Sequence, residues 1–389
     1  MVELLYLSIP ASAAPYGANE PENDLRNWIV KNVGATSQTA GGGDVASVGL
    51  PDLKIGTLDN LVVQSEEVAR LDGQLQGLVF KIHDIILQLF ESPAQVAQAE
   101  KIDNLGAAHY LRQFGWNTAK YRPDLPIGTL LEQINQDAMN ADHDLKTRFT
   151  GYQNAKTALA AADRKRTGDL TVRSLDSILS KDDVVESEYL ETVVVVVPSV
   201  LISDFRSKYE TLSQMVVPRS AKEVLREKDS SLFTVVVFKK FASDFAHKAR
   251  EAKWIIRELL FESDNAGNSE LDVEAAQQQV TKLKGDITRL ATAAYSDIIK
   301  AWGHVKIIRL FVESVLRYGL PPNFVTAAFT PSISVSKAEA ILIDQFGYLG
   351  GNAVKRDTSG KVKTEDFSEF GAVVEHDYKP FVIYVLELP

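Results

Sequence analysis

The hydrophobic positions of the chain form two long, heptad-spaced stripes that lie far apart in the sequence. The first runs from about Thr129 to Arg166 and alternates steps of three and four residues through Leu131, Ile134, Ala138, Ala141, Leu145, Tyr152, Ala155, Leu159 and Ala162. The second begins near Leu271 with the same spacing: Val273, Ala276, Val280, Leu283, Ile287, Leu290 and Ala294. A repeat sustained over this length is typical of a coiled-coil seam. The stripes therefore predict two long helices that pack together as a rod.

The two helices are expected to run antiparallel, because together they would tie one folded end of the chain to the other. At about 1.5 Å per residue, the first would span roughly 57 Å. An alignment that pairs Leu131 with Trp302 places Arg148 opposite Gly285. We interpret Arg148 as a buried arginine that uses the space at the glycine and the charge of Asp286. The alanine-rich seam fits either a bendable spacer or a close helix approach.

The parts outside the stripes show globular patterns. The first ten residues alternate as a strand, and a glycine-rich loop reaches to about residue 50. Helical spacing follows over Leu58–Phe90, and a shorter helix lies near Ala107–Trp116. After Ala294 the return helix becomes apolar around much of its circumference, which is typical of a helix buried in a domain. Gly319 and the prolines after it end this helix.

The segment between the stripes changes to a mixed pattern of strands and helices. We expect strands at 193–197, 232–238 and 254–261, with helices at 203–212 and 241–252. Near the C-terminus, a strand at 324–329, a helix at 337–346 and a strand at 381–388 are expected. The last strand alternates in a way that could pair with the N-terminal one, which would bring both ends of the chain into one domain.

These elements predict an α+β protein shaped as a dumbbell, with a globular head and foot joined by a long antiparallel two-helix coiled-coil neck. The foot would comprise 1–128 and 319–389, the neck helices 129–166 and 270–318, and the head 167–269. The inserted head of about one hundred residues is large enough to form a domain.

Composition excludes several classes of function. The chain has 389 residues, of which 45% are hydrophobic and 24% charged, as expected of a folded protein. The net charge of -10 argues against nucleic acid or an anionic membrane as the main partner. No cysteine is present, which excludes disulfides and thiolate chemistry and fits a cytosolic setting. No apolar run reaches eighteen residues, so we expect no membrane insertion. The first residues lack the basic segment of a secretory signal, so we expect no such signal.

No motif indicates catalysis or a cofactor. The six histidines show no metal-ligand spacing: His83, His109, His143, His247, His304 and His376. The glycine-rich stretches Gly41–Gly43 and Phe346–Ala353 lack the phosphate-binding patterns, so loop and turn explanations are favoured. The basic cluster Arg164, Lys165 and Arg166 either complements the dipole at a helix end or forms a docking patch for an acidic partner. The residues alone favour a non-enzymatic strut.

Several strings resemble the family of the C subunit of the eukaryotic vacuolar-type proton-pumping ATPase (V-type ATPase). They occur in family order and cover nearly the full chain: LKIGTLDNLVVQSEEVARLD (53–72), AKTALAAADRKRTGDLTVRSL (155–175), VESVLRYGLPPNF (312–324), FGYLGGNA (346–353) and YKPFVIYVLEL (378–388). The resemblance implies an elongated, non-catalytic subunit with a head, a two-helix neck and a foot made from both chain ends. This implied shape agrees with the layout predicted from the heptads.

The resemblance also implies partners and a place in the cell. The C subunit joins peripheral stalks, each a heterodimer of the E and G subunits, to the cytosolic domain of the membrane-bound a subunit. It leaves when the pump reversibly separates, so it would be peripheral on the cytosolic face of vacuolar or endomembranes. The best candidates for stalk contact are exposed basic residues near the head: Arg164, Lys165, Arg166, Arg173, Lys239 and Lys240. The alternative is a free-standing cytoskeletal linker, since some members are reported to bind actin.

Overall fold

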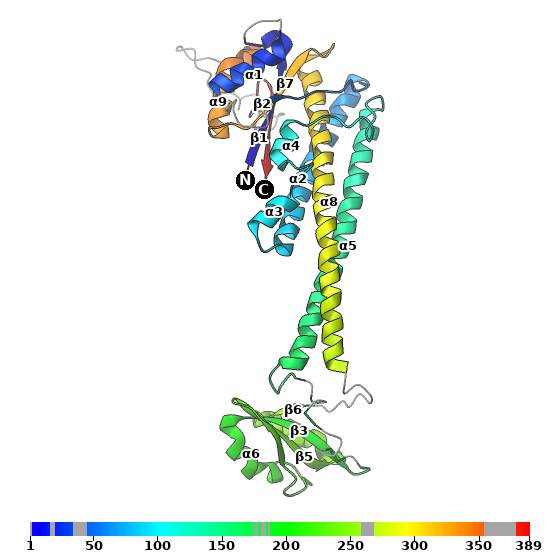
Figure 1. Ribbon diagram of the computed structural model, residues 1–389, viewed down its shortest axis with the longest axis vertical. Helices are drawn as coiled ribbons and strands as arrows, with labels where there is room; N and C mark the ends of the chain where they lie inside the picture. Colours follow the sequence, from blue (N-terminus) through cyan, green and yellow to red (C-terminus); the bar gives the residue numbers. More distant parts are fainter. Residues whose placement is uncertain are drawn as a thin grey trace. The chain divides into compact units, whose positions relative to one another are not determined.

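The computed structural model of the chain contains two compact units (Figure 1). It describes residues 2–15, 20–33, 45–173, 175, 178–179, 184–185, 187–257, 268–353 and 379–389. Unit 1 comprises Met1–Arg148 and Asp286–Pro389, and unit 2 comprises Phe149–Gly285. The expectations for the glycine loop at Gly41–Gly43, the end of a strand at 258–261 and a histidine at 376 lie outside the described residues.

Two long helices, α5 and α8, contribute to both units. Helix α5 spans Ile127–Thr167 and α8 spans Asn268–Tyr318, as the two heptad stripes predict. The stripe residues with described side chains are all buried or half-buried. Most of the other described residues after Leu145 in α5 and before Ile287 in α8 are exposed. Arg148 is exposed, so the interpretation of Arg148 as a buried arginine is wrong. The physical reason is that a long side chain can reach water even from a seam position. The alignment of Arg148 with Gly285 stays a prediction.

Unit 1 is built on a four-stranded antiparallel sheet with the order β2-β7-β1-β8. Its strands are β1 (Val2–Pro10), β2 (Val45–Ser47), β7 (Phe324–Phe329) and β8 (Val382–Leu388). The remaining helices of the unit are α1 (Pro21–Asn32), α2 (Leu58–Leu89), α3 (Pro93–Ala99), α4 (Ala107–Arg112) and α9 (Val335–Phe346). Short 3-10 helices follow β1 at Ala11–Ala13 and α9 at Gly347–Ala353.

The pairing of β1 with β8 confirms that the two chain ends share one sheet. Tyr6 lies opposite Tyr384 in the antiparallel register, and the N- and C-terminal strands run side by side in Figure 1. Alternate residues of β1 face opposite layers. Leu5, Leu7 and Ile9 join the core formed with α1 and α9, whereas the hydroxyl of Tyr6 donates to the carbonyl oxygen of Leu111 at α4. Both faces of the sheet are therefore covered.

Unit 2 has a second four-stranded antiparallel sheet, with the order β4-β5-β3-β6. Its elements follow the sequence β-α-β-β-α-β: β3 (Leu190–Pro198), α6 (Ile202–Lys208), β4 (Lys222–Arg226), β5 (Ser230–Phe238), α7 (Ala242–Glu251) and β6 (Ile255–Arg257). This succession and strand order are those of two split β-α-β units, in which each unit places one strand between the two strands of the other. In both β-α-β units, a 3-10 turn lies between the first strand and the helix. The turns are η3 (Ser199–Leu201), after β3, and η5 (Lys239–Phe241), after β5.

Both faces of this sheet are also apolar. Val193, Val195 and Val197 pack with Phe205 of α6 and Phe245 of α7 in one core cluster. The intervening residues of β3 pack on the opposite face in a second cluster: Val194 and Val196 with Leu170, Leu175 and Leu179. Burial on both faces explains the unbroken run of valines, because a strand with one wet face would alternate apolar and polar residues.

Several elements differ from the sequence expectations. Helix α3 was not predicted, and β2 lies in the stretch interpreted as a glycine-rich loop. Helix α1 lies partly in the stretch interpreted as surface loop, and Pro21 at its first turn suits a helix start because proline lacks the amide hydrogen. Strand β4 was not predicted, since its sequence, KEVLR, is rich in charge and lies at the edge of the sheet. The antiparallel sheets confirm the α+β class.

Candidate functional site

The basic residues Arg164, Lys165 and Arg166 form the last turn of α5 in unit 2, and all three are exposed. Nη2 of Arg166 lies 3.1 Å from Oδ1 of Asp163 in the same helix. Cations at this position interact favourably with the partial negative charge of a helix C-terminus. Their placement therefore agrees with the helix-end explanation and leaves their side chains accessible to a partner.

Arg173 is held within unit 2 and is half-buried, so the expectation of an exposed side chain is wrong for this residue. Its Nη2 donates to Oε1 of Glu227 at 2.7 Å, in the turn between β4 and β5. Its carbonyl oxygen accepts a 3.0 Å hydrogen bond from Nη2 of Arg257 in β6. These contacts fix the segment that covers one face of the sheet.

Lys239 and Lys240 lie on η5, directly after β5, and both are exposed. The backbone amide of Lys239 donates to the carbonyl oxygen of Tyr189 at 2.9 Å. Nζ of Lys240 lies 5.9 Å from the ring centroid of Phe241, within the range of a cation–π interaction. The sheet therefore presents this pair of lysines at one of its ends.

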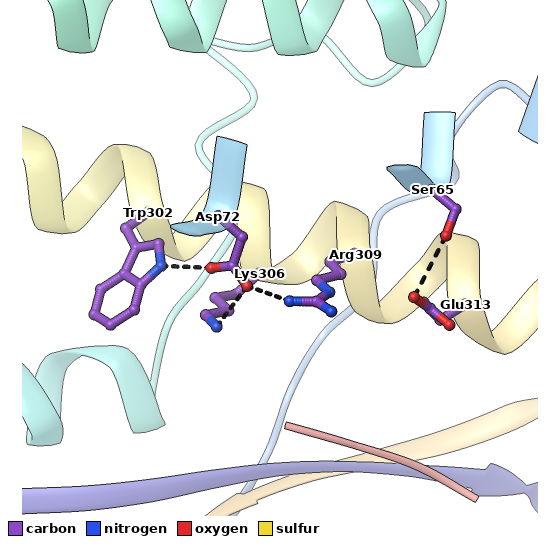
Figure 2. Close-up of polar contacts among 6 residues, drawn as sticks. All are labelled: Ser65, Asp72, Trp302, Lys306, Arg309 and Glu313. Atoms are coloured by element: carbon purple, nitrogen blue, oxygen red, sulfur yellow. Dashed lines mark hydrogen bonds and ion pairs between the residues drawn. The ribbon is translucent and has the colours of Figure 1, made fainter. Parts of the chain in front are cut away.

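Unit 1 contains a buried charge cluster that the sequence reasoning did not find. We define the cluster as Asp72 of α2 with Trp302, Lys306 and Arg309 of α8 (Figure 2). Oδ1 of Asp72 accepts from Nε1 of Trp302 at 2.7 Å. Oδ2 accepts from Nζ of Lys306 at 2.8 Å and from Nη1 of Arg309 at 2.6 Å. Every donor comes from α8, so the carboxylate fastens α2 to that helix.

The cluster extends to the C-terminal strand through an aromatic ring. Cζ of Arg309 lies 4.3 Å from the ring centroid of Tyr384 in β8. One turn further along α8, Glu313 accepts a 3.4 Å hydrogen bond from Ser65 of α2 (Figure 2). Burial raises the pKa of Tyr384, and the charge of Glu313 adds to this effect. The contacts connect α2, α8 and β8, three elements that are far apart in sequence.

The electrostatics of the cluster follow from its burial. Burial by itself would raise the pKa of Asp72, but the charges and hydrogen bonds of Lys306 and Arg309 outweigh it and lower that pKa. Burial lowers the pKa of Lys306, which Asp72 opposes. Both Asp72 and Lys306 have side chains only 4% exposed. Because both carboxylate oxygens already accept hydrogen bonds from α8, we interpret the cluster as a structural contact that holds α2 against α8.

Two features of the sequence could have revealed this cluster. Asp72 occupies the apolar face of the predicted 58–90 helix, four residues after Val68 and three before Leu75. Lys306 lies in the part of α8 that is apolar around its circumference. A charge in such a helix must be buried, and a buried charge needs a partner of opposite sign.

A second polar centre of unit 1 surrounds His304, which is only 3% exposed. The imidazole lies among the rings of Phe114, Trp116 and Tyr121, with centroid distances from 4.7 to 4.9 Å. Its Nδ1 donates to the carbonyl oxygen of Lys300 at 2.7 Å, and its Nε2 accepts from the amide of Asn117 at 3.1 Å. A cavity of about 290 Å³ lies beside it.

Burial lowers the pKa of His304 to about 4, so the ring is neutral near pH 7. With one nitrogen donating and the other accepting, the tautomer is fixed. The close packing extends to the backbone, since a Cβ on Gly303 would lie 2.5 Å from the ring of Phe114. We interpret His304 as a structural residue that locks the 113–121 segment onto α8.

Neither a metal site nor a membrane-spanning helix occurs in the described part of the chain. Among those residues, no group of three or more histidine, aspartate or glutamate side chains has the arrangement of a metal site. Within the same residues, no helix combines the length and the apolar character needed to cross a membrane.

Comparisons with known proteins agree on one family. Residues 5–382 match the family model of the V-ATPase C subunit. The chain is 38% identical to the C subunit of the V-type proton ATPase of Saccharomyces cerevisiae, over 99% of this chain and 98% of that protein. It is 36% identical to the corresponding C subunit of Caenorhabditis briggsae over 99% and 97% of the two chains. The C 1-A subunit of the Danio rerio V-type proton ATPase is 35% identical over 87% and 88%.

Proposed function

The chain belongs to the V-ATPase C-subunit family, and from this premise we propose that it is a non-catalytic connecting subunit of a V-type proton ATPase. The observation that carries the proposal is the match across nearly the whole length of both chains, including 98% of the yeast protein. The pump as a whole transports protons, and this chain would support that transport by holding other subunits together.

The proposed partners are the peripheral stalks, each formed by the E and G subunits, and the cytosolic domain of the a subunit. Two compact units give the chain two separate regions that could each bind a partner. The helices that belong to both units, with 41 and 51 residues, would span roughly 60 and 75 Å. Their heptad stripes support the proposal of an antiparallel neck between a head at 167–269 and a foot at 1–128 and 319–389.

Such a connector would resist torque on the stator through two linked contacts. Binding at one end raises the effective concentration at the other, so two weak contacts together can be strong. Each contact alone can still dissociate, which suits reversible assembly of the pump. We place the chain at the cytosolic face of vacuolar or endomembranes, as a peripheral subunit that requires no cofactor.

A non-catalytic role is supported by the two polar centres of unit 1. The carboxylate of Asp72 is paired through both oxygens. Both nitrogens of His304 are used in hydrogen bonds. The arrangement stabilises the unit and leaves neither group poised for proton transfer to a substrate. The alternative of a free-standing actin-binding linker has no support, since the relatives carry the names of pump subunits.

The test is association of the purified chain with a V-type ATPase prepared without its C subunit. We expect one copy of the chain to co-purify with each pump and to cross-link to the E, G and a subunits. Recovery of the chain with actin filaments, and not with the pump, would contradict the proposal.

A further inference from the structure

Unit 2 contains an internal repeat of about 40 residues. Ser203-Asp204-Phe205 in α6 recurs as Ser243-Asp244-Phe245 in α7, and each helix follows a strand and a 3-10 turn. The two phenylalanines are fully buried in the same core. Each aspartate also forms an ion pair with a lysine four residues later, at 3.2 Å to Lys208 and 2.9 Å to Lys248.

The hydrogen bonds of the sheet follow the same relation. The amide of Ser199 donates to the carbonyl oxygen of Asp229 at 2.9 Å, and at the corresponding positions Lys239 donates to Tyr189 at 2.9 Å. The register of β3 and β5 is centred on the opposed residues Val194 and Thr234, which are also equivalent in the repeat. A local two-fold axis therefore relates the two ends of the sheet, which share the strand end, the 3-10 turn and this hydrogen bond.

The two ends carry different exposed side chains. We name one the lysine end: Tyr189, Met215, Phe238, Lys239 and Lys240. Its three apolar or aromatic residues are 65%, 61% and 36% exposed. The other we name the valine end: Pro198, Ser199, Val200 and Asp229. Val200 is 89% exposed, but this end has no aromatic side chain. Since both ends share the strand end, the 3-10 turn and the hydrogen bond described above, these shared parts of the fold do not require the aromatic side chains of the lysine end.

Met215 adds backbone strain at the lysine end. Its φ of 61° lies in the left-handed region, which is uncommon for residues other than glycine. The amide of Phe238 donates to its carbonyl oxygen at 3.3 Å, which holds Met215 beside the end of β5. Strained residues of this kind concentrate at functional sites. An exposed methionine held in this way is available for contact with a partner.

We propose that the lysine end is a docking surface for an acidic amphipathic helix of another subunit of the pump. The exposed lysines complement carboxylates, even though Glu188 lies next to them. Tyr189 and Met215 supply the apolar contact area that such a helix buries. Strand addition is disfavoured at this end, because the amides of Phe238 and Lys239 already donate within unit 2. The inference rests on the proposed function, since it places the partner inside the pump.

The repeat supplies a matched control for the test. The variant combines Tyr189→Ala with Lys240→Glu. The control at the valine end combines Val200→Ala with Lys228→Glu, which also removes one exposed apolar side chain and replaces one exposed lysine by glutamate. The measurement is the dissociation constant of each full-length chain for a pump purified without its C subunit, with thermal unfolding as a check of folding. We expect the variant to bind at least about tenfold more weakly and the control to bind as the wild type does.

A photoreactive benzoylphenylalanine at Tyr189, with Asp229 as the control position, identifies the occupant. We expect cross-links from position 189 to an acidic helical segment of a pump subunit. Equal binding by the variant and the wild type, a weaker control, or a cross-link only from position 229 would overturn the inference. Binding of the wild type to phosphatidylserine vesicles that the variant loses would overturn it in favour of a membrane surface. Failure of the wild type to bind the pump would instead contradict the proposed function.

Discussion

Unit 1 and unit 2 each contain a four-stranded antiparallel sheet with apolar side chains on both faces, but a charge pair buried in unit 1 contrasts with a repeated pair on the surface of unit 2. In unit 1, Asp72 and Lys306 are paired in the interior, with side chains 4% exposed. In unit 2, the repeated ion pairs lie on helix surfaces, and Asp204 and Lys208 are both more than half exposed. Breaking the interior pair of unit 1 should therefore cost much more stability than breaking the surface pair of unit 2.

The largest effect is expected at the buried carboxylate. Asp72→Asn would leave the buried Lys306 without its counter-charge, and removing one partner of such a pair costs about 3–5 kcal/mol. Chemical denaturation of the full chain, followed by tryptophan fluorescence, would report the loss. A cost below about 1 kcal/mol would show that the cations find another partner, and it would remove the contrast between the units.

The next effect is a pH dependence that arises from unit 1. Because burial lowers the pKa of His304 to about 4, the unfolded chain takes up a proton near pH 6.5 that the folded chain excludes. Stability is therefore lost as the pH falls from about 6.5 to about 4, by roughly 3 kcal/mol at the lower limit. Denaturation across this range should show a shallower decline in His304→Gln. An equal decline in the wild type and in His304→Gln would contradict this origin of the pH dependence.

Two glycines of α8 should respond in opposite directions to the same substitution. Gly303→Ala would press a methyl group against Phe114, and overpacking of this kind costs about 1–3 kcal/mol. At Gly285, in unit 2, an added Cβ meets no atom within 4 Å. Gly285→Ala should therefore stabilise the chain by up to about 1 kcal/mol through helix propensity. Thermal unfolding of both variants would check the signs, and destabilisation by Gly285→Ala would indicate a close neighbour at that position.

The smallest effect is expected at the surface ion pair of α6. Asp204→Ala removes an exposed pair with Lys208, which contributes less than about 1 kcal/mol. The same denaturation assay as for Asp72→Asn measures this cost, so the effects of an interior and a surface charge can be compared directly. A cost comparable with that of Asp72→Asn would mean that exposure does not separate the two units.

The sequence predicted those elements whose periodicity is long and regular. The heptad stripes predicted α5 and α8, and alternation at both chain ends predicted the pairing of β1 with β8. Strand β4 was not predicted because its five residues, with charged residues at both ends, are too few to show a periodic pattern. An edge strand also need not alternate apolar and polar residues. Arg148 was misinterpreted because a seam position does not show whether a long side chain reaches water.

The sites were harder to predict than the elements. Lys239 and Lys240 could be proposed from their positive charge in the expected head region. By contrast, the charge cluster depends on Asp72 meeting residues more than 200 positions later in the chain. The repeat in unit 2 was visible in the two Ser-Asp-Phe strings, but its meaning depends on the register of β3 and β5. Long-range pairing of this kind requires the fold before it can be recognised.

ATP-driven acidification of vesicles tests whether the chain acts by connecting subunits of a proton pump. Vesicles would carry a V-type ATPase that lacks its C subunit, and the purified chain would be added at increasing concentration. We predict that acidification rises from near zero to a plateau as the chain binds to saturation, while the isolated chain hydrolyses no ATP. Stoichiometric binding of the folded chain without recovery of proton transport would contradict the claim.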